Sequence, residues 1–188
     1  MGLTRSGARP GDDIWVSGCV GGAWAALMHR WGKLTLDARV FPAAALAMDR
    51  PKPRNALGTA LLSSATACAD ISDGLAQDLG HILERSGVDA DVLWDAVPKH
   101  PALAALSQEQ QVEAAMSGGD DYELVFTAPA DKRGLIEQAS ISALTPVTRI
   151  GRIVEKKPSG APLAIRDASG RPLFLPVQGF DHFAQSAD

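Results

Sequence analysis

The sequence predicts an α+β fold in which a mixed β-sheet carries helices packed on one face. Short runs of apolar and β-branched residues alternate with segments whose apolar residues recur at helical spacing. Hairpin-like runs around residues 163–165 and 172–174, together with long insertions, break the regular βαβ series of a parallel sheet. The 188 residues are 46% hydrophobic and 21% charged, which is enough to build the core of one domain.

The charge and hydropathy of the chain exclude two classes of partner. The 22 acidic and 18 basic residues give a formal charge of −4, and the basic residues are scattered, whereas nucleic acid is bound by a basic patch. No apolar run reaches the roughly 20 residues that span a bilayer, and residues 1–13 are too polar for a secretory signal. We therefore expect a cytoplasmic protein with no nucleic-acid or membrane partner. Cys19 and Cys68 lack CxxC spacing and are expected to be inert core thiols.

The chain is predicted to begin with a strand, a glycine turn and a helix. Pro10 and Gly11 form a turn before the strand at residues 14–16. Residues 18–22 then lead into a helix with apolar residues at helical spacing from Trp24 to Trp31. The glycine turn either cradles an anion with its N–H groups or lets the helix pack closely on the strand. The second interpretation is favoured, because the Lys-Ser/Thr of a P-loop is missing.

Residues 50–54, Arg-Pro-Lys-Pro-Arg, are predicted to form a stiff extended arm, since each proline disfavours helix at the preceding residue. The arm is either a solvated linker or a grip for phosphate. A helix is expected over residues 55–65, with Asn55 available as its cap.

Residues 66–87 have the pattern of a strand, a turn and an amphipathic helix. An apolar strand at 66–71 is followed by Ser72-Asp73-Gly74 and then by apolar residues on one helical face, and the helix is expected to end at Gly87. Further along, the sequence predicts strands at 88–93, 122–127 and 147–154 and helices at 102–116, capped by Ser107, and at 129–140.

Asp70, Ser72 and Asp73 concentrate oxygen ligands at the turn between strand and helix. Mg²⁺ is commonly held by one or two carboxylates together with phosphates and water, so the two aspartates could bind it while Ser72 contacts a phosphate. Alternatively, Asp73 is the helix N-cap and Asp70 a turn residue. The residues alone leave these interpretations in balance, although a cap needs only one of the carboxylates.

A second acidic segment follows the paired glycines at 118–119. Adjacent strand residues point to opposite faces, so Asp120 and Asp121 are not expected to serve the same ligand; the alternative is a tight turn with solvated acids. His81 has no second histidine or cysteine at ligand spacing, which argues against a transition-metal site. Phe180 and Phe183 flank Asp-His and either line a ring-stacking pocket or pin the terminus to the core.

Taken in order, five segments resemble the later half of thiamine-monophosphate kinases, and the match covers essentially the whole chain. The wider superfamily includes aminoimidazole ribonucleotide synthetase and has two domains, with ATP and magnesium between them. The resemblance implies that residues 1–188 are one carboxy-terminal ATP- and substrate-binding domain of the aminoimidazole ribonucleotide synthetase-like fold. Residues 1–13 would be the interdomain segment, with the amino-terminal domain absent. The five segments are residues 5–12, 50–54, 70–74, 118–124 and 179–183.

The resemblance implies ATP-dependent phosphorylation of thiamine monophosphate to thiamine diphosphate, with Mg²⁺ as cofactor. No residue is assigned a catalytic role. The family usually has glutamate at the position of Asp120, so the carboxylate is one methylene shorter here. The residues that match the family's binding positions are Asp70 and Asp73 for Mg²⁺, Arg5 and Ser72 for ATP, and Asp120 and Phe180 for the substrate.

Two functions stay open from the sequence. The chain is either a kinase domain or a non-catalytic module that binds nucleotide or thiamine phosphate. Phosphoryl transfer depends on positioning and charge neutralisation, so the chain alone, without the other domain's metal ligands, is expected not to turn over. A homodimer also stays open, because the family's dimer interface resembles a sheet built mostly from the absent domain.

Overall fold

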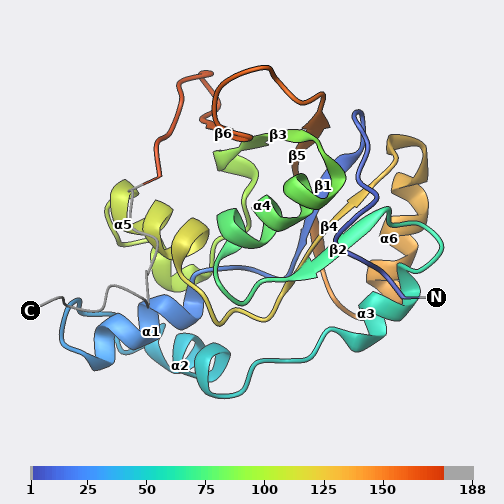
Figure 1. Cartoon of the computed structure of the whole chain (residues 1–188). Helices are drawn as coiled ribbons and strands as arrows, with labels where there is room; N and C mark the ends of the chain where they lie inside the picture. Colours follow the sequence, from blue (N-terminus) through green and yellow to red (C-terminus); the bar gives the residue numbers. More distant parts are fainter. Residues whose placement is uncertain (1, 176–188) are drawn as a thin grey trace, which may run out of the picture.

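A mixed β-sheet forms the centre of the computed structural model, which describes residues 2–175 (Figure 1). Within these residues the strand order is β2-β4-β1-β5-β3-β6. Neighbouring strands are antiparallel except for β3 and β6, which are parallel. The strands are β1 (Asp13–Ser17), β2 (Ala67–Asp70), β3 (Asp89–Leu93), β4 (Leu124–Ala128), β5 (Val147–Val154) and β6 (Leu163–Arg166).

Six α-helices and several short helical turns lie around this sheet in the described part of the chain (Figure 1). The helices are α1 (Gly22–Arg30), α2 (Phe41–Asp49), α3 (Asn55–Ala60), α4 (Leu75–Ser86), α5 (Gln108–Val112) and α6 (Arg133–Ser142). The turns are η1 (Trp94–Ala96), η2 (Pro101–Leu103), η3 (Glu113–Ser117) and η4 (Ala130–Lys132). None of the helices in residues 2–175 is long and apolar enough to cross a membrane.

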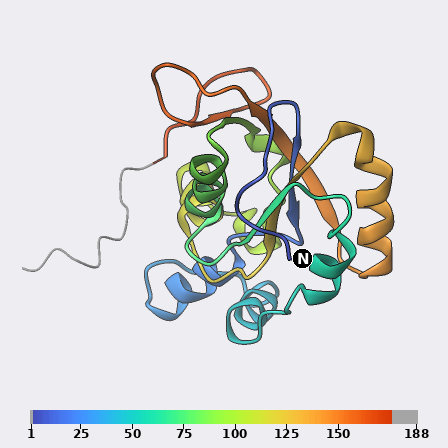
Figure 2. The ribbon, with the colours of Figure 1, turned by 45° about the vertical axis from the view of Figure 1, so that its right-hand side comes forward.

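The alternation of side chains along β1 divides the core into two layers. Ile14 and Val16 belong to the larger hydrophobic cluster with residues of α1 and α4, whereas Trp15 faces a smaller cluster that includes Leu57 of α3 and Ile136 of α6. Figure 2 shows α4 (green) and α6 (orange) on opposite sides of the sheet. The predicted α+β fold with a mixed sheet is confirmed, and the short helices α3 and α6 cover the second face, which the sequence did not indicate.

The antiparallel pairing of β4 with both β1 and β2 determines where the loops meet. Val16 of β1 pairs with Val125, and Asp70 of β2 pairs with Leu124. The carboxyl ends of β1 and β2 therefore lie beside the amino end of β4. As a result, the segments after Ser17, after Asp70 and before Leu124 are gathered at one end of the sheet.

Two predicted helices differ from the observed ones. The region 102–116 is not one helix: Ser107 is extended (ψ 156°) and begins α5 with a capping box shared with Gln110, so its predicted cap is confirmed while the continuous helix is wrong. The helix predicted over 55–65 ends at Ala60, and its N-cap is Arg54 rather than Asn55.

Candidate functional site

The first acidic loop, residues 70–74, connects β2 to α4. Gly74 is the N-cap of α4, with φ of 116°, and no side chain caps the helix there. Instead, one carboxylate oxygen of Asp78 accepts hydrogen bonds from the backbone N–H groups of Ser72 (2.9 Å) and Asp73 (3.0 Å). The interpretation of Asp73 as the N-cap is therefore wrong. Asp78, from within α4, holds the loop that precedes the helix rather than capping the helix itself, and the exposed Asp73 side chain accepts a hydrogen bond from Gln77 at 3.3 Å.

The second acidic loop, residues 118–123, lies directly against the first. The backbone N–H of Asp120 donates to the carbonyl of Ser72, and that of Tyr122 donates to the carbonyl of Ile71, both at 2.9 Å. A Cβ atom on Gly119 would lie 2.3 Å from the carbonyl oxygen of Ser72, so this approach requires glycine. The two loops, far apart in the sequence, therefore form one surface.

Asp120 and Asp121 have different surroundings, as predicted. Asp120 is exposed, with φ of 65°, so a left-handed turn rather than strand alternation separates the two side chains. Both oxygens of Asp121 lie 3.0 Å from the backbone nitrogen of Gly21 at the start of α1. Burial raises the pKa of Asp121 to about 7, against the opposing effect of the hydrogen bonds from the backbone of Gly21 and Ala23.

The glycine turn before α1 serves packing. A Cβ atom on Gly22 would lie 2.7 Å from the ring of His100, and one on Gly21 would lie 2.6 Å from Leu103. The carboxylate of Asp121 already occupies the position that an anion would take at this helix end. The structure therefore supports the packing interpretation of the turn over the anion cradle.

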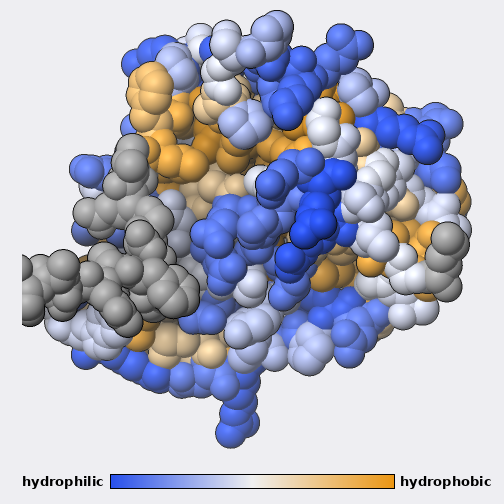
Figure 3. Space-filling view, viewed as in Figure 1, coloured by the Kyte–Doolittle hydropathy of each residue, from blue (hydrophilic) through white to orange (hydrophobic). Residues whose placement is uncertain are grey.

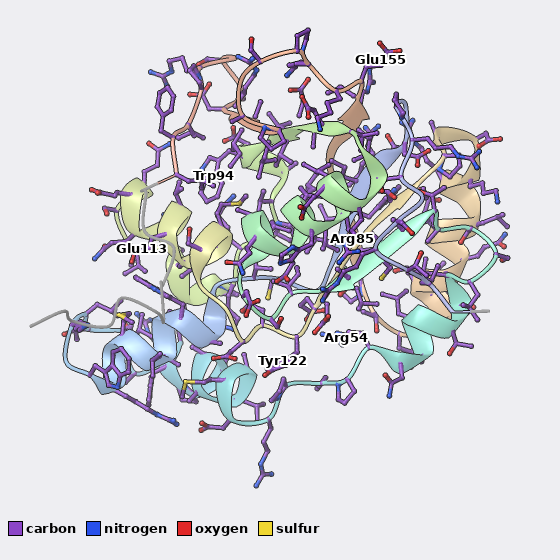
Figure 4. All side chains as sticks on the ribbon, viewed as in Figure 1. Arg54, Arg85, Trp94, Glu113, Tyr122 and Glu155 are labelled. Atoms are coloured by element: carbon purple, nitrogen blue, oxygen red, sulfur yellow. The ribbon has the colours of Figure 1, made fainter. Side chains whose placement is uncertain are left out.

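An open groove of about 820 Å³ runs beside the edge strand β2. The amino-terminal segment follows this strand, since the N–H of Cys68 donates to the carbonyl of Thr4 at 2.9 Å. The Arg5 guanidinium lies 3.7 Å from the carboxylate of Asp70, and both side chains are about half exposed. Figure 4 shows Arg54 and Tyr122 close to this end of the sheet. The lining also includes Leu3, Pro51, Pro53, Asn55, Gly58, Thr59, Leu62, Cys68, Ala69 and Leu124.

Arg54, the last residue of the Arg-Pro-Lys-Pro-Arg arm, is anchored inside the protein. Its guanidinium donates to both oxygens of Glu123, at 2.7 and 2.5 Å, and Ser17 also donates to this carboxylate. Only 9% of the Glu123 side chain is exposed. Arg54 is therefore not free to grip phosphate in this arrangement, whereas Arg50 and Lys52 are exposed.

Asp73, Asp78 and His81 offer one possible ligand atom each, and these atoms lie within 4.8 Å of one another. The sequence analysis considered only histidine and cysteine partners for His81, whereas its neighbours here are carboxylates: Asp78 lies three residues earlier in α4 and Asp73 on the loop before that helix. Burial raises the pKa of Asp78, and the charges of Asp73 and Asp70 raise it further. The oxygen donors of the loop suit Mg²⁺, which would take carboxylates together with substrate phosphates and water. Figure 3 shows a band of hydrophilic residues across α4 on this face.

The predicted residues not yet placed are the two cysteines and the aromatic and histidine residues near the carboxy terminus. Burial raises the pKa of the Cys19 thiol to about 11 and that of the Cys68 thiol to about 12, so both are poor nucleophiles, as predicted, but both are half-buried rather than core residues and Cys68 lines the groove. Phe180 and His182 lie outside the residues that the structure describes.

Comparison with known proteins identifies the family. Residues 9–162 match the family described as AIR synthase related protein, C-terminal domain. The chain therefore belongs to this family, and the fold predicted from the resemblance is confirmed.

The similar curated proteins are thiamine-monophosphate kinases. That of Salmonella typhimurium is 40% identical over 187 residues, which is 97% of this chain and 55% of the relative. The crystal structure of thiamine-monophosphate kinase from Stenotrophomonas maltophilia K279a is 41% identical with a TM-score of 0.79, over 87% of this chain and 52% of that one. A structure described as AaThiL complexed with AMPPCP and TMP is 28% identical with a TM-score of 0.71, over 91% and 52%. The chain thus spans about half the length of the relatives it matches.

Proposed function

We propose that this chain is the carboxy-terminal domain of an ATP-dependent kinase that converts thiamine monophosphate to thiamine diphosphate. The observation that carries the proposal is the interlocking of the two acidic loops at the end of the groove, where Ser72 joins Asp120 through the backbone. The similar thiamine-monophosphate kinases support the reaction. The relative complexed with AMPPCP, an ATP analogue, and TMP supports the two substrates.

The proposed roles follow from the position of each side chain. Asp70 and Asp73 are exposed carboxylates on one loop and would hold Mg²⁺, which when bound neutralises charge on the transferring phosphate. Ser72, between them, would donate its hydroxyl to a phosphate oxygen, and Arg5 would add a positive charge beside Asp70. Asp120 would face the thiamine substrate from the second loop. Phe180 is proposed as a further substrate contact only because it matches an aromatic position of the family that the sequence resembles.

The proposal also covers the domain arrangement, the cellular location and the oligomeric state. Residues 1–188 would form one domain, with residues 1–13 as the segment that leads to a separate amino-terminal domain carrying further metal ligands. A cytoplasmic location suits a reaction that consumes ATP, and a homodimer would be formed mainly through that other domain.

The proposal is tested by measuring thiamine diphosphate formation from Mg-ATP and thiamine monophosphate. The chain is assayed alone and mixed with the separately expressed amino-terminal half of the Stenotrophomonas maltophilia relative. We expect activity only in the mixture, and we expect Asp70→Asn to lower it by roughly 100-fold or more, in the range for loss of a group that stabilises transition-state charge. Glu84→Gln, which removes an exposed carboxylate near the other end of α4, is the matched control and should have no effect.

Because the chain spans only about half the length of its relatives, one alternative is also favoured: a non-catalytic module that binds nucleotide or thiamine phosphate. If the mixture forms no thiamine diphosphate while calorimetry shows that the chain binds thiamine monophosphate, the binding module is favoured and the kinase proposal is rejected. Activity of the mixture that is insensitive to Asp70→Asn would reject the role given to that residue.

A further inference from the structure

Asp78 lies behind the first acidic loop, and its side chain is buried, so it cannot contact a substrate directly. It is 1% exposed, and one of its oxygens holds the N–H groups of Ser72 and Asp73. We propose that Asp78 is a positioning residue for the metal and phosphate site. It fixes the backbone of the loop and adds a negative charge behind Asp73, which strengthens binding of a divalent cation. The inference rests on the proposed function, because it assumes that Asp73 is a metal ligand.

The geometry explains why the loop needs Asp78. The N-cap position is occupied by Gly74, which has no side chain to accept a hydrogen bond. The N–H groups of Ser72 and Asp73 lie on the loop before it, and both donate to the same oxygen of Asp78, which ties the loop to the first turns of the helix. The helix in turn fixes Asp78, whose own N–H donates to the carbonyl of Gly74 at 3.0 Å. Asp78 and the first acidic loop therefore stabilise each other's positions.

The loop is held from its other side by the second acidic loop. The N–H of Asp120 donates to the carbonyl of Ser72 at 2.9 Å, and Gly119 approaches the same carbonyl closely. Hydrogen bonds from two directions thus restrict the backbone from which the Asp73 side chain projects. A metal ligand held in one orientation loses less conformational freedom on binding.

The charge of Asp78 acts in addition to its hydrogen bonds. Possible ligand atoms of Asp73 and Asp78 lie within 4.8 Å of each other, and Asp70 is a third carboxylate on the same loop. Asp70 forms an ion pair with Arg5 at 3.7 Å, and both side chains are about half exposed. The buried carboxylate of Asp78 attracts a cation bound at Asp73 more strongly than a carboxylate in water would, because the protein interior screens the charge of Asp78 less.

The test compares two variants that separate the hydrogen bonds from the charge. Asp78→Asn keeps the shape and an acceptor oxygen but removes the charge, whereas Asp78→Ala removes both. Mn²⁺ is the probe, titrated into the chain and followed by electron paramagnetic resonance, and thermal unfolding is measured in parallel. We expect Asp78→Asn to keep the melting temperature and to weaken Mn²⁺ binding about fivefold or more. Asp78→Ala should weaken binding further and also lower the melting temperature.

Three outcomes decide the inference. Mn²⁺ affinity of Asp78→Asn equal to that of the unaltered chain would overturn the role of the charge. Glu84→Gln, a control on the same helix, should bind as the unaltered chain does, and equal weakening there would also overturn it. Asp73→Asn separates this failure from that of the proposed function: if it too leaves Mn²⁺ binding unchanged, or if the unaltered chain binds no Mn²⁺ either alone or mixed with the amino-terminal half of the relative, the proposed metal site itself is wrong.

Discussion

Replacing Arg54 by methionine should strongly destabilise the protein, because it leaves the carboxylate of Glu123 buried without its charge partner. The Glu123 side chain is 9% exposed, and two of its hydrogen bonds come from the Arg54 guanidinium. Breaking a buried ion pair by removing one partner costs about 3–5 kcal/mol. Folded domains are stable by about 5–15 kcal/mol, so Arg54→Met should remove a large part of the total.

The assay is urea unfolding followed by circular dichroism, with the free energy of unfolding extrapolated to water. Lys52→Met is the matched control, since Lys52 is exposed on the same arm, and it should change the free energy by less than about 0.5 kcal/mol. The double variant Arg54→Met with Glu123→Gln should recover part of the loss, because a neutral amide can still bond to Ser17. A cost for Arg54→Met no larger than that of the control would refute the reasoning.

Three further predictions concern single positions. The pKa of Asp121 is raised in the folded state to about 7 from its ordinary 3.8, so the folded state holds a proton that the unfolded state has lost and stability should fall as pH rises between these values. Asp121→Asn should flatten that pH dependence in urea unfolding at pH 5 and 8, and an unchanged slope would contradict the assignment. Gly119→Ala should destabilise by roughly 1–3 kcal/mol because its Cβ would meet a carbonyl oxygen at 2.3 Å, whereas Gly80→Ala, with open space in α4, should stabilise by up to about 1 kcal/mol; equal shifts in melting temperature would disprove this contrast. Ser107→Ala should cost about 1 kcal/mol through loss of the cap of α5, and an unaltered melting temperature would exclude it.

The elements predicted most closely are those whose signals are local. The strand and helix between residues 66 and 87 could be recognised from the apolar stripe of α4 and from Gly87, which ends the helix in the left-handed conformation with φ of 67°. The helix α2 was missed, although Pro42 at its first turn and its run of alanines were available signals. The interruption at Ser107 could not be judged from periodicity, because a capping side chain competes locally with a continuous helix.

Part of the candidate site could be proposed from the sequence for the same reason. Asp70, Ser72 and Asp73 are neighbours in the sequence, so their concentration on one loop was visible. The pairing of Arg54 with Glu123 joins residues 69 positions apart, and a single sequence does not reveal which distant charges meet. Asp78 was missed because it looks like an ordinary polar residue of an amphipathic helix, and only the backbone path of the loop shows its use.

The position of β1 in the middle of the sheet determines when it can fold during synthesis. Its registered partners are β4, at residues 125–128, and β5, at residues 147–152. Ile14, Trp15 and Val16 therefore leave the ribosome as an apolar strand with neither partner yet made. At about 5–20 residues per second, this interval lasts on the order of 5–20 seconds. The nascent chain accordingly depends on later translation, or on a chaperone, to cover the strand that becomes the centre of its fold.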